Sequence, residues 1–136
     1  ETVSFDRIPA SGVPDELSIH QGEFRGSLEC VRKQADSLWS LKKSSIDKNA
    51  YFQNSKFGIL NLQEVTIGGR LNLVDTTVKK YLDLRDIEVA GSISIKNLTV
   101  GKSVLCGDNI ALAIKFFMQL GGKVEVSRSG VKKLYR

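Results

Sequence analysis

The chain has 136 residues, of which 41% are hydrophobic and 26% are charged, and its net charge is +5. This length supports one core without disulfides or metal, and no apolar run approaches the ~20 residues of a membrane-spanning helix. Most of the net charge lies in residues 107–136, which hold two acids and the bases Lys115, Lys123, Arg128, Lys132, Lys133 and Arg136. A basic segment is a typical footprint for nucleic acid, an anionic surface or an acidic partner.

Residues 1–12 predict an irregular lead-in, because Phe5, Ile8 and Pro9 follow no period. The chain begins at Glu1 rather than Met. The expected compartment therefore stays open between the cytoplasm and export after removal of a leader.

An 11-residue repeat runs from Val13 to Cys106. Each unit has an apolar residue, a second one four positions later and a third two positions after that. The clearest units are Ile67-Leu71-Leu73, Val78-Leu82-Leu84, Val89-Ile93-Ile95 and Val100-Val104-Cys106. Earlier units are Val13-Leu17-Ile19, Phe24-Leu28-Cys30, Ala35-Trp39-Leu41, Ile46-Ala50-Phe52 and Phe57-Leu60-Leu62, the last being one residue short. Residues 33–55 are polar enough for a loop or a short helix to replace the repeat there.

Apolar residues two positions apart put both side chains on one face of a strand, and this spacing does not make a helical stripe. The first apolar residue of each unit reaches the same core from beyond a corner, where Gly68 and Gly91 permit a bend. One unit cannot bury its own apolar face, so copies must stack. We therefore predict an all-β fold, a parallel β-helix (β-solenoid) of 11-residue units. Two units, about 22 residues, form one coil, with three units per coil as the alternative.

The pattern changes to a helix after Cys106. Asp108 or Asn109 is the expected N-cap, the helix follows from Ile110, and Gly121-Gly122 ends it. This helix, with Phe116 and Phe117 on its core side, should cover the last coil, and Val124 and Val126 should add one strand. The expected organisation is a single β-solenoid domain over 1–136, with repeats at 13–106 and a capping helix and basic tail at 107–136.

No catalytic residue, metal site, cofactor or small-molecule substrate is predicted. Cys30 and Cys106 lie seven units apart, roughly 17 Å along the stack, so we expect buried reduced thiols rather than a disulfide. His20, the one histidine, is expected at a surface corner. The run Gly68-Gly69-Arg70 lacks the context of a phosphate-binding loop and is expected to form a corner.

Stacking of alternate units would place Glu64, Asp86 and Asp108 on one corner, and Asp75 with Asn97 on the other. Like charges about 5 Å apart extend into water or bind a cation, and we expect the solvated arrangement. The outward strand positions are mixed and mostly small, without the aromatic platform of a single-strand nucleic-acid binder. They are Ser18, Glu29, Ser40, Tyr51, Asn61, Asn72, Asp83, Ser94 and Leu105.

The run Ile67-Gly68-Gly69-Arg70-Leu71-Asn72-Leu73 is echoed by residues 89–95. It resembles the "IGGxLxL" repeats of bacterial pentapeptide-like β-helix proteins. It also resembles the bactofilins, polymer-forming cytoskeletal proteins with a short β-solenoid. The resemblance covers about residues 57–106 and implies a bacterial β-helix protein.

Three functions are consistent with these observations, and an enzyme is the least favoured class. The first is a non-enzymatic protein-interaction or scaffold module of a bacterial protein. The second is a self-assembling structural element of bactofilin type. The third is a basic module that binds nucleic acid or an anionic surface through its C-terminal tail.

Overall fold

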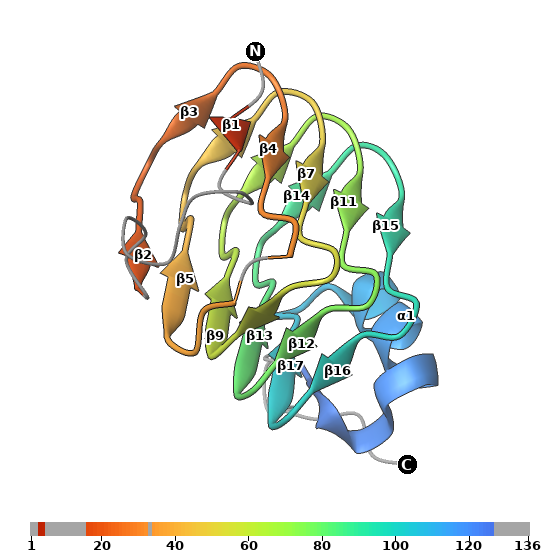
Figure 1. Cartoon of the computed structure of the whole chain (residues 1–136). Coiled ribbons are helices and arrows are strands. Elements are labelled where there is room, and N and C mark those ends of the chain that lie inside the picture. Colours follow the sequence, from red (N-terminus) through yellow and green to blue (C-terminus); the bar gives the residue numbers. More distant parts are fainter. Residues whose placement is uncertain (1–2, 5–15, 33, 127–136) are drawn as a thin grey trace.

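The computed structural model describes residues 3–4, 16–32 and 34–126, and it shows a β-solenoid with a helix at its C-terminal end (Figure 1). Short strands of successive coils stack into four parallel sheets, here called A to D. One coil passes through β10 (Thr66–Ile67) in sheet C, β11 (Leu71–Asn72) in sheet A, β12 (Thr77–Val78) in sheet D and β13 (Tyr81–Asp83) in sheet B. The predicted parallel β-helix is confirmed.

The remaining strands extend the same four sheets. Sheet A also contains β1 (Val3–Ser4), β4 (Leu28–Glu29), β7 (Ala50–Tyr51) and β15 (Ile93–Ser94). Sheet B contains β2 (Leu17–Ser18), β5 (Leu38–Ser40), β9 (Ile59–Asn61), β17 (Ser103–Leu105) and β18 (Val124–Glu125). Sheet C contains β3 (Glu23–Phe24), β6 (Ser45–Ile46) and β14 (Glu88–Val89), and sheet D contains β8 (Lys56–Phe57) and β16 (Thr99–Val100).

The register between neighbouring strands sets the length of a coil. Leu71 pairs with Ile93, a step of 22 residues, so two 11-residue units form one coil as predicted. Trp39 pairs with Leu60 at a step of 21, because the unit that begins at Phe57 is one residue short.

Residues 34–55 stay in the repeat, so the alternative of a loop or a short helix in this segment is wrong. Trp39, Ile46 and Phe52 are buried in the common core. The polarity of this segment is misleading because some of its polar side chains also face inward. The hydroxyl of Ser55 donates to the carbonyl of Cys30 and, at 3.2 Å, to that of Gln53. Backbone carbonyls thus satisfy a buried polar group without a loop.

Ser55 belongs to a fourth inward position of the unit that the sequence pattern did not predict. Its members are buried and lie two residues before the first apolar position: Ser44, Ser55, Val65, Thr76, Ile87 and Leu98. In the next coil the hydroxyl of Thr76 makes the matching bond to the carbonyl of Phe52 at 2.8 Å.

Two corners of each coil turn through a residue with positive φ. These residues are Gln21, Arg32, Lys43, Asn54, Glu64, Asp75, Asp86 and Asn97, with φ between 55° and 64°. After Cys106 the same conformation falls on Gly107, at φ 61°, rather than on Asp108. Asn and Asp tolerate this conformation at four of these positions, whereas the side chains of Gln21, Arg32, Lys43 and Glu64 bear a cost of about 1–2 kcal/mol each.

The lead-in is not entirely irregular. Val3 pairs with Leu28 and Ser4 with Glu29, so β1 adds one strand to sheet A before the first full coil. Phe5, Ile8, Pro9 and Val13 lie outside the described residues.

The C-terminal cap follows the prediction. Helix α1 (Ile110–Leu120) is capped by Asn109, whose side chain accepts from the backbone N–H of Leu112 at 3.0 Å, and Gly121 is its C-cap. Leu112, Ala113 and Phe116 are buried, and Phe117 packs against the core. A 3-10 turn (Gly121–Lys123) then returns the chain to sheet B, where Val124 of β18 pairs with Val104.

Candidate functional site

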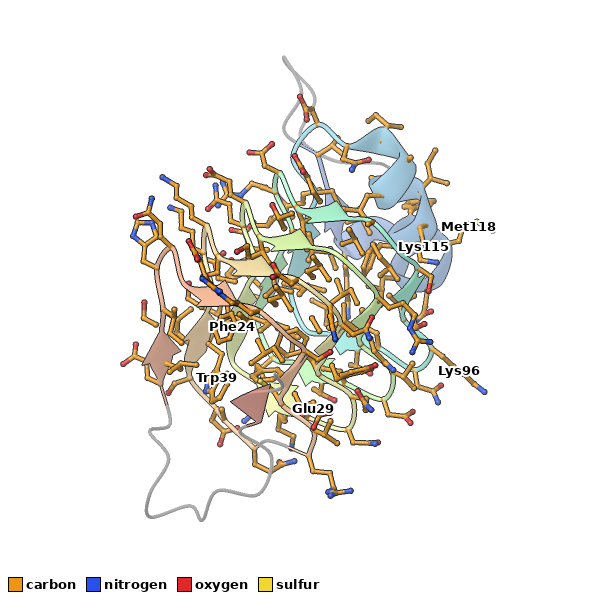
Figure 2. The ribbon with its side chains drawn as sticks, turned by 90° about the horizontal axis from the view of Figure 1, so that it is seen from above. Phe24, Glu29, Trp39, Lys96, Lys115 and Met118 are labelled. Carbon is orange, nitrogen blue, oxygen red and sulfur yellow. The ribbon has the colours of Figure 1, made fainter. Side chains whose placement is uncertain are left out.

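The structure describes Lys115 and Lys123 of the predicted basic residues, and these two side chains lie in different surroundings. Lys115 is exposed on α1, and Figure 2 shows it with Met118 at the end of the stack away from Phe24. The Nζ of Lys123 donates to the carbonyl of Val100 at 3.0 Å, so this ammonium caps the open edge of sheet D. Its role is at least partly structural. The remaining predicted residues lie outside the described part of the chain: Arg128, Lys132, Lys133 and Arg136.

Cys30 and Cys106 are both buried, as expected, and they do not form a disulfide with each other. Burial raises the pKa of the Cys106 thiol to about 12, and the negative charge of Asp83 adds to the effect. A neutral buried thiol is a poor nucleophile. His20 is exposed beside the first full coil.

The carboxylates do not gather into a cation site. The amide nitrogen of Asn97 donates to Asp75 at 2.9 Å, which pairs one rung of the column with its neighbour. Glu64 and Asp86 occupy equivalent exposed corners, but Asp108 leaves the column because Gly107 takes the turn position. Across the described residues, no three His, Cys, Asp or Glu side chains come together in a way that could hold a metal ion.

A hollow lies at the corner between sheets D and B, where the repeat loses one residue. The neighbouring coils have three residues between their inward apolar positions here, 36–38 and 79–81, whereas this coil has only Gly58 and Ile59. Gly58 also lacks a side chain, and a Cβ there would lie 2.4 Å from the carbonyl oxygen of Asp36. The result is a hollow of about 240 Å³ lined by Asp36, Ser37, Leu38, Gly58, Ile59 and Lys80.

The missing side chains let groups two coils apart meet across the hollow. The Nζ of Lys79 lies 2.9 Å from the carboxylate of Asp36. This hydrogen bond and the charge of Lys79 lower the pKa of Asp36, and the charge of Lys56 adds a smaller effect. The one carboxylate that lines the hollow is therefore neutralised by its own neighbours.

Lys80 and Lys102 form a column at the same corner. They occupy equivalent positions in consecutive coils, because the backbone N–H of Lys102 donates to the carbonyl of Lys80 at 2.9 Å. Both side chains are exposed, and neither is paired with a carboxylate in the described part of the chain. The nearby carboxylate of Glu125 accepts from the hydroxyl of Ser103. Because consecutive coils lie about 4.8 Å apart, the two lysines are near neighbours, and their like charges repel unless an anion lies between them. We call Lys56, Lys79, Lys80 and Lys102 the basic corner.

A partly exposed apolar stripe borders the basic corner on sheet B. Leu38, Ile59 and Tyr81 share one outward position in successive coils, since Leu38 pairs with Ile59 and Leu60 with Leu82. Leu38 and Ile59 are half-buried, whereas Tyr81 is 37% exposed. In the described residues Tyr81 is the only aromatic side chain among the exposed large hydrophobics.

The next outward column of sheet B is more buried than expected. Asp83 is only 6% exposed, and its two carboxylate oxygens bind Arg85 Nε at 2.9 Å and Arg85 Nη2 at 2.7 Å. This two-point contact raises the pKa of Arg85. Asp83 is therefore committed to the fold rather than free to bind a partner.

The sequence contains a signal for the basic corner in the spacing of its lysines. Lys80 and Lys102 are 22 residues apart, one coil length, so a search for like residues at that spacing would have found them. The bases of the C-terminal tail are more conspicuous, because they are close together in sequence. The short unit at Phe57 is evident in the sequence, but the hollow that it creates depends on how neighbouring coils stack at that corner.

No protein-family model, curated protein or solved structure matches this chain. The described helix is too short to cross a membrane. The function is therefore inferred from the fold and the surface of the chain.

Proposed function

We propose that the protein is a non-enzymatic interaction module that binds an acidic protein partner through the basic corner. The observation that carries the proposal is the stacked pair Lys80 and Lys102, two exposed ammonium groups without a carboxylate partner in the described residues. Charge complementarity of this kind accelerates association and selects partners. The resemblance to bacterial β-helix repeat proteins agrees with a scaffold role.

A protein partner is favoured over nucleic acid by what surrounds the column. Apolar side chains, Leu38 and Ile59, line the adjoining hollow, and Tyr81 is a lone exposed ring rather than a series of stacking platforms. Successive aromatic platforms support the bases of single-stranded nucleic acid.

Self-assembly by end-to-end stacking is less well supported. At the C-terminal end α1 packs against the last coil, and Gln119 Nε2 donates to the carbonyl of Ile95 at 2.7 Å. Together with Lys123 it satisfies carbonyls that a stacked copy would have to bind.

The test is fluorescence anisotropy of labelled poly-L-glutamate with the full chain at low salt. We expect binding that weakens with added salt, and about tenfold or more weakening in the double variant Lys80→Glu/Lys102→Glu. The matched control is Lys96→Glu/Lys115→Glu, which changes the net charge equally at two other exposed lysines.

Three results would contradict the proposal. One is absence of binding to poly-L-glutamate. Another is equal weakening in the two double variants, which would indicate net charge rather than a site. The third is evidence for another site or ligand. Loss of binding only in Lys132→Glu/Lys133→Glu would favour the basic tail, and tighter binding to a single-stranded oligonucleotide would favour nucleic acid.

A further inference from the structure

The hollow beside the basic corner points to the kind of segment that binds there. We infer that it receives one aliphatic side chain of an extended acidic segment, whose carboxylates lie on Lys80 and Lys102. This inference rests on the proposed function and specifies its ligand. The hollow, at about 240 Å³, is smaller than the ~300–1,000 Å³ pockets that bind drug-sized molecules, so a single side chain suits it better.

The lining of the hollow is suited to an aliphatic group. Leu38 and Ile59 present half-buried apolar surface, and Gly58 leaves the floor without a side chain. Asp36 is held by Lys79 at 2.9 Å, so the one acidic group in the lining is already paired. An apolar side chain placed here would complete the burial of Leu38 and Ile59.

The charges around the hollow set the direction of the segment. Asp36 lies on the side of the earlier coil, whereas Lys80 and then Lys102 follow on the side of the later coils. Carboxylates are therefore attracted toward the later coils, because at the earlier end the ammonium of Lys79 is already engaged by Asp36. Because an extended chain advances about 3.3 Å per residue and coils about 4.8 Å, the carboxylates should follow roughly one to three residues from the aliphatic anchor.

The experiment compares two labelled synthetic peptides that differ at one position. One contains a single leucine followed by three spaced glutamates, and the other has serine in place of that leucine. On the unaltered protein we expect the leucine peptide to bind about tenfold more tightly, and both peptides to weaken with salt.

Two protein variants test whether the leucine side chain of the peptide binds in the hollow. Leu38→Thr/Ile59→Thr removes apolar lining while keeping residues that suit a strand. Insertion of one serine between Gly58 and Ile59 restores the 11-residue spacing and fills the hollow. Thermal melts by circular dichroism establish which variants fold. If the insertion variant does not fold, the variant Leu38→Thr/Ile59→Thr provides the test. In each folded variant the preference for leucine should disappear.

Equal affinity of the two peptides for the unaltered protein would overturn the inference. If the two peptides bound equally and both lost affinity in Lys80→Glu/Lys102→Glu, the proposed function would stand and only the aliphatic anchor would be refuted. A leucine preference that persisted in the folded variants would also overturn the inference, because the side chain would then bind elsewhere. Absence of binding by either peptide would refute the inference and the proposed function together.

Discussion

Replacing Glu64 by glycine should stabilise the protein, although glycine usually destabilises a folded chain. Glu64 is an exposed corner residue with φ 58°, a conformation that suits glycine and strains other residues. Its backbone N–H donates to the carbonyl of Arg85 at 2.9 Å, and a glycine keeps that bond. The variant therefore tests whether the corners of this solenoid store backbone strain.

The expected gain follows from two opposing terms. Relief of the left-handed conformation contributes about 1–2 kcal/mol, and the extra entropy of unfolded glycine removes about 0.5–1 kcal/mol. The net gain in the free energy of unfolding is about 1 kcal/mol, which for a chain of this length raises Tm by roughly 3 °C.

Glu88→Gly is the matched control, because it removes the same exposed side chain from strand β14, where φ is not positive. We expect it to lose about 0.5–1 kcal/mol. Differential scanning calorimetry of both variants and the unaltered chain gives the comparison. A fall in Tm for Glu64→Gly similar to that for Glu88→Gly would refute the strain argument.

Three further outcomes are expected from burial and close contact. Leu82→Asp should unfold the domain, as measured by circular dichroism, since Leu82 is fully buried, whereas Ile114→Asp, at a side chain that is 51% exposed, should leave it folded. Gly58→Ala should lower the urea midpoint, because the added Cβ would lie 2.4 Å from the Asp36 carbonyl oxygen, and Gly122→Ala, with open space around it, should not. The thiol of Cys106, with a pKa near 12, should resist a thiol reagent at pH 8 until urea unfolds the chain, and rapid labelling of the native protein would contradict its burial.

The period of the fold was predictable because burial repeats with the chain. Leu71, Leu82 and Val104 fill equivalent inward positions, and such positions leave a pattern in the sequence. Segment 34–55 was harder to predict, because inward Ser44 and Ser55 look like loop residues until their backbone partners are known. The joining of β1 to sheet A was hidden because Val3 pairs with Leu28 at a step of 25 residues, outside the period.

The candidate site was less predictable than the fold, because it depends on what neighbouring coils bring together. Lys79 meets Asp36 only because a glycine and a missing residue lie between them. Lys80 and Lys102 become neighbours only once the coil length is known to be two units. Local sequence cannot distinguish such a column from lysines on a solvated surface.

The most direct test of the proposed interaction is a nuclear magnetic resonance titration of the isotope-labelled chain with the leucine and glutamate peptide. The largest amide shifts are expected at residues 36–38, 58–59, 79–81 and 102, which the fold brings to one corner, with α1 unchanged. Shifts concentrated in residues 110–136, or no saturable shifts at all, would contradict binding at the basic corner.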